Sequence, residues 1–408
     1  LFCLVLLAFA GLSVRLILIN RDNGDSYKKQ VLSQQQYSST TIPYKRGEIL
    51  DSKGTKLASS EKVYDLVLDI KQMNNKEDYV EPTIQALEDY FSIDGDQVRA
   101  YAQEHPDSQY YVLKKRMSYN EISDYQQMMA DTSQKEYNQY VKGIWFEDEF
   151  KRIYPYNSLA CNVIGFATSD GGTGNGGIEQ SYNDSLVGTN GREYGYLNDD
   201  SNLERVIKPA ENGDTIVSTI DVNIQNAVEK RINEWMSDPG SEHIGVMVMN
   251  PNNGEVLAMA NNSMFDLNNP RSAADSCSEE ELRTYGLKEA MQTYNRQHKK
   301  TDGSTITTDQ VPEHYSADEI RSFGLQVAWN QKWRNYDISD TFEPGSPSKI
   351  FTVAAALEEG VISPNDTFYC DGYQEVAGHQ IKCTAFRKGG HGMLTAAEAL
   401  MVSCNDAM

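Results

Sequence analysis

A sharp turn that leads directly into an apolar helix spans residues 344–360 and constrains the fold more tightly than any other segment. Pro344-Gly345 favours a turn, and Pro347 suits the first helical position because its missing N–H would have no partner there in any case. Gly360 is a typical residue for ending a helix. Ser346 is therefore predicted to lie at a helix N-terminus, where backbone amides and the helix dipole stabilise developing negative charge.

Lys349 lies one helical turn beyond Ser346, so the two side chains are expected on the same face of the helix. A serine hydroxyl is a weak nucleophile at neutral pH and needs a nearby base. A lysine that is desolvated in a cleft can have its pKa lowered enough to accept the proton. The pair therefore suggests nucleophilic catalysis, and the alternative is an N-cap serine beside a solvated lysine.

Residues 1–19 form an apolar run that Arg15 alone interrupts. A membrane span needs about 20 residues, and an arginine near its end can reach the interface. We predict an uncleaved signal-anchor over 1–19, in preference to a cleaved signal peptide or a buried helix, with the polar remainder outside the cytoplasm. Residues 20–41 are rich in Gln, Ser and Tyr and are expected to form a stalk.

Length and composition place the remainder among ordinary globular proteins. The chain has 408 residues, of which 39% are hydrophobic and 24% charged, and this suggests two or three domains. Its net charge of -22 argues against a nucleic-acid partner, because affinity for nucleic acid comes chiefly from Lys and Arg that neutralise phosphates.

An elongated N-terminal domain of mixed helix and strand is predicted over 20–212. Apolar residues recur at helical spacing over 84–91, and a capping box at 118–121 predicts a second helix that continues to Met129. The glycine-rich segment 171–177 contains a formal G-x-G-x-x-G. No strand precedes it and no Walker-type lysine follows, so we predict a plain flexible loop.

A second domain is predicted over 213–408. Its first residues favour a strand over 214–220, followed by a helix that Asp221 caps, with an apolar face between Ile224 and Trp235. Asn252-Asn253-Gly254 predicts a tight hairpin, because Asn-Gly tolerates the positive φ angles of such turns. This order predicts an α/β (α+β) domain with helices on an antiparallel sheet.

A polar, charged stretch over about 270–330 interrupts the second domain and is predicted to be a surface insertion.

Six cysteines are too few for a disulfide scaffold in a chain of this length. Cys370, His379, Cys383 and His391 could suggest a zinc site, but their spacings are not those of a C-x-x-C site and exported thiols tend to oxidise. We expect loop residues or a disulfide there in preference to a metal. Cys404 is predicted to be a small buried helix residue, with redox pairing to Cys383 as the alternative.

The order of motifs along the chain resembles that of class B penicillin-binding proteins. S-x-x-K at 346–349 followed by S-x-N at 403–405 is the pairing found in penicillin-binding proteins and serine β-lactamases. Earlier landmarks resemble those of the family and occur in the same order: Arg46-Gly47-Glu48-Ile49-Leu50-Asp51, Arg152-Ile153-Tyr154-Pro155, Gly177-Ile178-Glu179, Thr219-Ile220-Asp221, Met249-Asn250-Pro251 and Gly390-His391-Gly392.

The resemblance implies a peptidoglycan D,D-transpeptidase whose catalytic domain has the fold of serine β-lactamases. Ser346 would attack the penultimate D-Ala carbonyl of a D-Ala-D-Ala stem peptide, release the terminal D-Ala and pass the acyl group to an amine of a neighbouring stem. Lys349 would deprotonate the serine, while Ser403 and Asn405 would relay protons and hold the substrate amide. β-Lactams would acylate Ser346 as mimics of the dipeptide. No cofactor is expected.

The same resemblance implies partners and a location. The expected partners are peptidoglycan stem peptides, a membrane glycan polymerase of the SEDS type and other division or elongation membrane proteins. The expected location is the bacterial cell membrane, with a single span and an extracytoplasmic catalytic domain. The alternatives are a D,D-carboxypeptidase or β-lactam sensor that passes the acyl group to water, and a non-catalytic cell-wall scaffold.

The sequence departs from the family in one motif. Class B enzymes also use a K-[ST]-G strand, whose lysine binds the substrate carboxylate and whose backbone lines the oxyanion hole. Neither K-T-G nor K-S-G occurs here. We therefore expect this sequence to be truncated at both ends and incomplete as a catalyst. The polar stretch over 270–330 is also longer than the family usually carries.

Overall fold

The computed structural model describes Arg15 and the ranges 38–168, 172–197, 203–238, 240–299 and 303–407. Apart from Arg15, the signal-anchor predicted over 1–19 lies outside the described residues, as does most of the stalk. Within the described ranges, no helix is both long enough and apolar enough to cross a membrane. The chain divides into two compact units, residues 1–339 and 340–408.

The first unit mixes helices and strands along its length, which confirms the predicted mixed class for the described residues. Its strands are β1 (Ser38–Ile42), β2 (Ile49–Leu50), β3 (Lys56–Leu68), β4 (Tyr111–Met117), β5 (Ile144–Ile153), β6 (Phe166–Ala167), β7 (Gly174–Asn175), β8 (Gly191–Leu197), β9 (Leu203–Lys208), β10 (Ile216–Val217), β11 (Gly245–Met249) and β12 (Val256–Asn261). Its α-helices are α2 (Ile70–Met73), α3 (Glu77–Phe91), α4 (Gly95–Glu104), α5 (Tyr119–Ala130), α6 (Lys135–Asn138), α7 (Cys161–Ile164), α8 (Gly177–Ser181), α9 (Asn183–Leu186), α10 (Val222–Ser237), α11 (Glu279–His298), α12 (Ala317–Trp333) and α13 (Tyr336–Ser339). Short 3₁₀ helices are η1 (Thr132–Gln134), η2 (Pro270–Ala274) and η3 (Thr308–Glu313).

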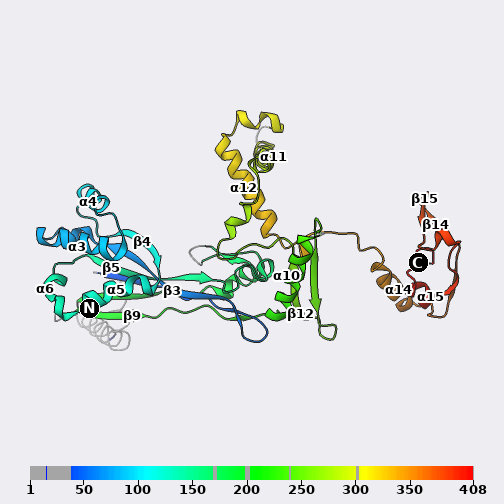
Figure 1. Ribbon diagram of the computed structural model, residues 1–408, viewed down its shortest axis with the longest axis horizontal. Helices are drawn as coiled ribbons and strands as arrows, with labels where there is room; N and C mark the ends of the chain where they lie inside the picture. Colours follow the sequence, from blue (N-terminus) through cyan, green and yellow to red (C-terminus); the bar gives the residue numbers. More distant parts are fainter. Residues whose placement is uncertain are drawn as a thin grey trace, which may run out of the picture. The chain divides into compact units, whose positions relative to one another are not determined.

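Strand β3 is the centre of the main sheet in this unit (Figure 1). It pairs antiparallel with β5 along ten residues, from Ser59↔Ile153 to Leu68↔Ile144, and also with β4. The helix predicted over 84–91 is confirmed, because α3 buries Ile84, Leu87 and Phe91 in the core beneath β3.

The capping box predicted at 118–121 is also confirmed. The Ser118 backbone N–H donates to Glu121 Oε2 at 2.7 Å, and α5 follows. The buried face of this helix includes Met128, whereas the predicted Met129 is 36% exposed. The helix was therefore placed correctly, and its predicted face was wrong by one residue at its end.

Three sequence landmarks meet in one buried ionic cluster. Arg46 Nε donates to Glu179 Oε2 at 2.8 Å, and Arg152 Nε donates to Glu179 Oε1 at 2.7 Å. Tyr154 donates its hydroxyl proton to the same Oε1 at 3.0 Å. The side chains of Arg46, Arg152 and Glu179 are at most 4% exposed. Because a buried charge without its partner is strongly destabilising, this cluster ties three distant segments together.

Asp51 and Asp221 organise a second junction. Asp51 Oδ1 accepts hydrogen bonds from the backbone N–H of Lys53 at 2.8 Å and of Thr55 at 2.7 Å, which closes a turn over residues 52–54. Lys53 Nζ in turn lies 2.7 Å from Asp221 Oδ2. Asp221 Oδ1 accepts from the Asn223 N–H at 2.9 Å, so the predicted cap of α10 is confirmed.

The elements that follow Asp221 agree only partly with the sequence. The hairpin β11–β12 forms as predicted, but the strand expected over 214–220 contracts to the two residues of β10. The apolar face predicted for α10 was only partly right: Ile232 is buried, but Trp235 is 46% exposed and the buried residues also include Gln225 and Glu229. Gln225 is buried because its side-chain amide binds both the N–H and the C=O of Met259.

The described part of the glycine-rich segment, residues 172–177, packs closely against neighbouring backbone. Gly174 lies in β7, which pairs with β6, and Gly177 begins α8. A Cβ on Gly174 would lie 1.9 Å from Glu179 O, so a larger residue has no room there. The prediction of a plain flexible loop was wrong for Gly174 and Gly177, because these glycines let the chain pack against neighbouring backbone that includes Glu179.

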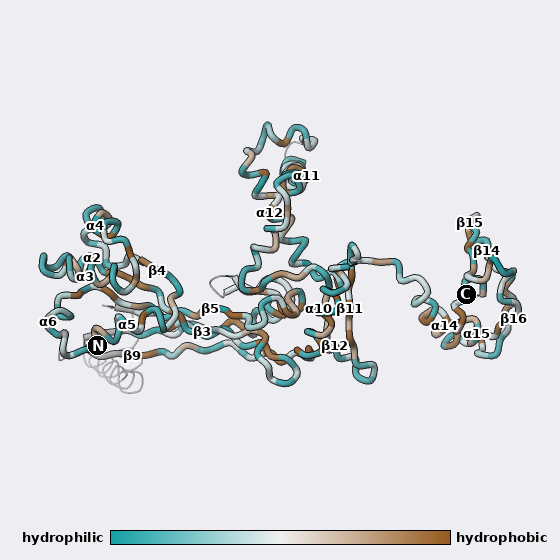
Figure 2. Tube along the Cα trace, viewed as in Figure 1, coloured by the Kyte–Doolittle hydropathy of each residue, from teal (hydrophilic) through white to brown (hydrophobic). Residues whose placement is uncertain are grey.

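The polar stretch predicted as an insertion over 270–330 contains two helices, α11 and α12, that pack against each other (Figure 1). Most residues of α11 are hydrophilic (Figure 2). The helices approach closely at Gly286 and Gly324, where a Cβ would lie 1.9 Å from Ile320 O and 2.0 Å from Leu282 O, respectively. The spacing of the helices therefore depends on glycine at both positions.

Within residues 340–407, the second unit contains two α-helices, one 3₁₀ helix and two antiparallel strand pairs, β13–β16 and β14–β15. Its elements are α14 (Ser348–Glu358), β13 (Thr367–Cys370), β14 (Tyr373–Val376), β15 (His379–Lys382), the 3₁₀ helix η4 (Phe386–Lys388), β16 (Gly392–Thr395) and α15 (Ala396–Met401). The predicted helix after Pro347 is confirmed, and it ends before Gly360, whose φ is +65°.

Candidate active site

Ser346 lies on the turn that leads into α14. Gly345 has a φ of +60°, a conformation that glycine adopts without strain. Ser348 closes the turn by donating its hydroxyl proton to Gly345 O at 2.6 Å, and the Lys349 backbone N–H donates to Ser346 O at 3.0 Å. The exposed Ser346 side chain is thus held at the N-terminus of α14, where the sequence predicted it.

Ser403 lies just beyond the end of α15 in a left-handed conformation, with a φ of +52°. The Ser403 N–H donates to Leu400 O, and the Cys404 N–H donates to Ala399 O at 2.9 Å, so the backbone closes the helix end tightly. A left-handed conformation costs a residue other than glycine about 1–3 kcal/mol, and such residues are concentrated at functional sites.

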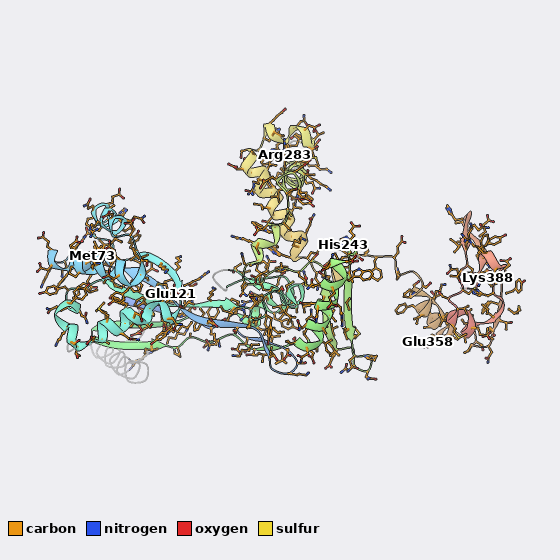
Figure 3. All side chains as sticks on the ribbon, viewed as in Figure 1. Met73, Glu121, His243, Arg283, Glu358 and Lys388 are labelled. Carbon is orange, nitrogen blue, oxygen red and sulfur yellow. The ribbon has the colours of Figure 1, made fainter. Side chains whose placement is uncertain are left out.

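One hydrogen-bond network joins the four predicted site residues, Ser346, Lys349, Ser403 and Asn405. They belong to the second unit, the part of Figure 3 in which Glu358 and Lys388 are labelled. Ser403 Oγ lies 2.9 Å from Ser346 Oγ. Lys349 Nζ donates to Ser403 Oγ at 3.2 Å, to Ser403 O at 2.8 Å and to Asn405 Oδ1 at 2.5 Å. Asn405 Nδ2 donates to Lys382 O at 2.8 Å. Lys349 therefore reaches Ser346 through Ser403, a contact that helical spacing alone could not reveal.

This network is chemically able to move a proton from Ser346 to Lys349. A neutral lysine has one lone pair that can accept the Ser403 hydroxyl proton, while Ser403 Oγ accepts the proton of Ser346. Hydroxyl groups rotate, so the direction of donation along the chain can reverse. The position of Ser346 at a helix N-terminus also favours negative charge on or near its oxygen.

Three thiols and an imidazole converge beside this network. His391 Nδ1 lies 3.4 Å from Cys383 Sγ and 3.6 Å from Cys370 Sγ. Cys383 Sγ lies 3.7 Å from Cys404 Sγ, and the four atoms all lie within 4.8 Å of one another. All three thiols are free. We call Cys370, Cys383, His391 and Cys404 the thiol–imidazole cluster, and its donor set is one that could hold a metal ion.

The structure differs from the sequence analysis, which considered Cys370, His379, Cys383 and His391 as a zinc candidate and preferred loop residues or a disulfide. Cys370 and His379 lie in strands β13 and β15, and the thiols are free. His379 is not a member of the thiol–imidazole cluster, because it is exposed at the start of β15, and four residues of extended strand separate it from Cys383 by about 13 Å. Cys404 takes its place. Cys404 is buried as predicted, but it follows the end of α15 and is not a helix residue. Spacing along the sequence could not identify donor groups that come from four separate segments of the second unit.

Two thiols of the cluster have shifted pKa values. Burial raises the pKa of Cys370 to about 12. Cys383 is also desolvated, but the backbone N–H groups of Ala385 and Asn405 donate to its sulfur, and its pKa is lowered to about 6.

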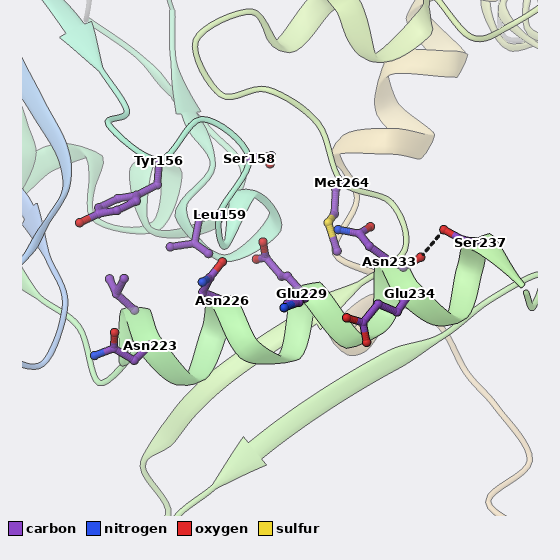
Figure 4. A pocket seen from close by; sticks show the side chains of 12 residues that line it. Tyr156, Ser158, Leu159, Asn223, Asn226, Glu229, Asn233, Glu234, Ser237 and Met264 are labelled. Atoms are coloured by element: carbon purple, nitrogen blue, oxygen red, sulfur yellow. Dashed lines mark hydrogen bonds between the residues drawn. The ribbon is translucent and has the colours of Figure 1, made fainter.

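A hollow of about 780 Å³ lies in the first unit between α10 and the turn that contains Tyr156 and Ser158 (Figure 4). Glu229 is its most buried acidic group. Its Oε1 accepts hydrogen bonds from the Ala160 N–H and from Gln225 Nε2, both at 2.7 Å, and burial raises its pKa. Since this carboxylate fastens α10 to the turn, we assign it a structural role.

Two family models match the chain. The model of the penicillin-binding protein dimerisation domain matches residues 41–218, and that of the penicillin-binding protein transpeptidase domain matches residues 244–408.

Individual proteins match over most of the chain. Stage V sporulation protein D of Bacillus subtilis is 26% identical over 377 residues, which cover 90% of this chain and 47% of that protein. The probable peptidoglycan D,D-transpeptidase PbpC of Pseudomonas aeruginosa is 25% identical over 371 residues, which cover 90% of this chain and 52% of that protein. The chain thus spans about half the length of these curated relatives.

A solved structure shows the same fold. Penicillin-binding protein 2X from Streptococcus thermophilus matches with a TM-score of 0.58 and 19% sequence identity, over 91% of this chain and 49% of that chain.

Proposed function

Because the chain belongs to the class B penicillin-binding proteins, we propose that the protein is a peptidoglycan D,D-transpeptidase with Ser346 as its nucleophile. The observation that carries this proposal is the hydrogen-bonded series Ser346–Ser403–Lys349 at the N-terminus of α14. It supplies a nucleophile, a relay and a base in mutual contact, which is the arrangement that serine acylation requires.

In the acylation step, Ser346 Oγ attacks the penultimate D-Ala carbonyl of a stem peptide. Its proton passes to Ser403 Oγ, and the Ser403 proton passes to a neutral Lys349 Nζ. Positive charge on Lys349 and the N-terminus of α14 then favour the oxyanion of the tetrahedral intermediate. The C–N bond then breaks, and the proton returns from Lys349 to the leaving amine. D-Ala departs, and the remaining acyl group of the stem peptide is held on Ser346 as an ester.

In the transfer step, the amine of a neighbouring stem attacks this ester. The same relay removes a proton from the attacking amine and returns one to Ser346 Oγ as the ester bond breaks. Asn405 holds Lys349 during both steps and can present its amide to the substrate backbone. A β-lactam would acylate Ser346 by the first step, since its strained amide occupies the place of the D-Ala-D-Ala bond.

The protein is also proposed to act at the bacterial membrane, held by the apolar run over 1–19 with its catalytic domain outside the cytoplasm. Its partners would be a SEDS-type glycan polymerase and other division or elongation membrane proteins. Family membership supports both statements. Treatment of intact and of permeabilised spheroplasts with an added protease tests the location. An extracytoplasmic domain is cleaved in both preparations, whereas a cytoplasmic domain is cleaved only after permeabilisation. Cross-linking in native membranes, followed by identification of a polymerase, tests the partner.

Labelling with a fluorescent penicillin tests the central proposal. The full-length protein in native membranes should give a labelled band that is absent in Ser346→Ala and retained in Ser363→Ala, the matched change of an exposed serine in the same unit. A well-folded wild type that takes up no label even at high probe concentration would contradict acyl-enzyme chemistry and favour a non-catalytic scaffold. A labelled protein that releases free acid in place of cross-linked product would favour a carboxypeptidase or a sensor.

A further inference from the structure

We propose that Cys370, Cys383, His391 and Cys404 bind one zinc ion, and that the bound ion fixes the S-x-N turn beside α14. The first part of this proposal stands on the thiol–imidazole cluster alone, and the second rests on the proposed function.

The donor set and its geometry favour tetrahedral zinc. Structural zinc sites commonly use three cysteines and one histidine, with Zn–S of about 2.3 Å and Zn–N of about 2.0–2.1 Å. A tetrahedron with those bond lengths has S···S edges of about 3.8 Å and S···N edges of about 3.5 Å. The cluster has a Cys383–Cys404 distance of 3.7 Å and His391–thiol distances of 3.4 and 3.6 Å.

The surroundings of the sulfur atoms also suit a metal site. The His391 backbone N–H donates to Cys370 Sγ at 3.3 Å, and the Ala407 N–H donates to Cys404 Sγ at 3.4 Å. Hydrogen bonds of this kind stabilise thiolates and orient metal ligands. Cys370, Cys383 and Cys404 are at most 4% exposed, so three thiolates here would need a cation to balance their charge.

The cluster is also the centre of the second unit. The buried hydrophobic core of this unit, within the described residues, consists of the three cysteines with Ala385 and Ala399. Such small side chains bury little apolar area, and a metal bound by four separate segments would cross-link them in place of a larger core. Four protein ligands leave no open position, which makes the site structural and not a catalytic Lewis acid.

The site is coupled to the candidate active site through one residue. Cys404 lies between Ser403 and Asn405, whose side chains both contact Lys349. A bond from Cys404 to a fixed ion would hold this turn, including the left-handed φ of Ser403. The zinc ion would therefore position Ser403 against Ser346 without touching substrate.

Metal content tests the first part. Full-length protein purified from native membranes under reducing conditions should contain about one zinc ion per chain by mass spectrometry of the metal. Cys370→Ser and Cys404→Ser should lose it. His379→Ala, which changes a histidine of the same unit outside the cluster, and Cys277→Ser, which changes a thiol of the first unit, should retain it.

A cobalt titration keeps the test valid if the cysteine variants fail to fold. Addition of Co²⁺ to metal-stripped wild type should produce thiolate-to-cobalt charge-transfer absorption that Zn²⁺ then abolishes. Wild type without zinc and without this absorption would overturn the proposal. So would a Cys383–Cys404 disulfide in protein from native membranes, seen as a mass lower by two hydrogens and as two thiols that resist alkylation.

Penicillin labelling before and after chelation tests the coupling. Zinc removal should slow labelling of Ser346, and zinc return should restore the rate, while Ser346→Ala should bind zinc normally. An unchanged labelling rate after zinc removal would overturn the positioning role. A zinc-loaded wild type that never labels would contradict the proposed enzymatic function and leave the metal site standing.

Discussion

Ser403 Oγ lies 2.9 Å from Ser346 Oγ, although the two residues are 57 positions apart in the sequence. Lys349 Nζ also donates hydrogen bonds to Ser403, to both the hydroxyl and the carbonyl oxygen of that serine. The S-x-N serine thus stands between the proposed nucleophile and the proposed base. Its left-handed backbone conformation keeps it there at a cost in stability, which is expected where geometry serves chemistry.

Replacement of Ser403 by alanine should slow acylation of Ser346. The relay hydroxyl would be lost while the nucleophile and Lys349 remain, and proton transfer by a positioned side chain contributes about 10²–10⁴-fold to rate. The rate of fluorescent-penicillin labelling under single-turnover conditions measures this. Ser363→Ala is the control, because Ser363 lies on an exposed turn outside the relay. Equal rates for Ser403→Ala and wild type would show that the proton takes another route.

Replacement of Lys349 by arginine should abolish most labelling even though positive charge is kept. Arginine does not deprotonate in proteins, so it cannot accept the serine proton. We expect a decrease of about 10²–10⁴-fold in acylation rate. Lys388→Arg, on the 3₁₀ helix η4 of the same unit, should label as wild type does. If Lys349→Arg labelled at the normal rate, the lysine would serve only as a positive charge.

The sequence predicted local parts of the site well and tertiary parts poorly. The turn at Ser346, the helix after it and the one-turn spacing to Lys349 depend on a few adjacent residues, so their patterns could be interpreted directly. Membership of Ser403 in the site followed only from a family resemblance, because its contact with Ser346 requires the fold of the whole second unit. The cluster that includes Cys404 was missed for the same reason.

Buried polar residues account for another difference. The face of α10 was predicted from apolar periodicity, yet Gln225 and Glu229 are buried and Trp235 is 46% exposed. Gln225 and Glu229 are buried because they bind backbone groups of Met259 and Ala160, respectively, which need hydrogen-bond partners. By contrast, the landmarks at Arg46, Arg152 and Glu179 were recognised in the sequence, but only the structure explains them as one ionic cluster.

Loss of the Glu179 charge should destabilise the first unit strongly. Glu179→Gln would leave Arg46 and Arg152 buried without a counter-charge, at a cost of about 3–5 kcal/mol in the free energy of unfolding. Chemical denaturation of the detergent-solubilised protein measures this. Glu279→Gln is the control, because its pair with Arg321 is exposed and should contribute little. Similar unfolding midpoints for the two variants would contradict a stabilising role for the cluster.

Stability of the first unit should depend on pH through Glu229. Burial raises its pKa in the folded state above the ordinary value of 4.5, so the folded protein holds a proton that the unfolded chain has already released. The free energy of unfolding should therefore fall as pH rises from the ordinary value through the raised one, by about 1.4 kcal/mol for each unit of difference.

Glu229→Gln removes this dependence, because an amide does not titrate and its oxygen can still accept from the Ala160 N–H. Relative to wild type, the variant should therefore gain stability as pH rises above the ordinary value of 4.5. Glu234→Gln, on the exposed side of α10, should follow the wild-type curve. If the free energy of unfolding of Glu229→Gln and of wild type changed with pH in parallel, the buried carboxylate would be fully stabilised by its two hydrogen bonds.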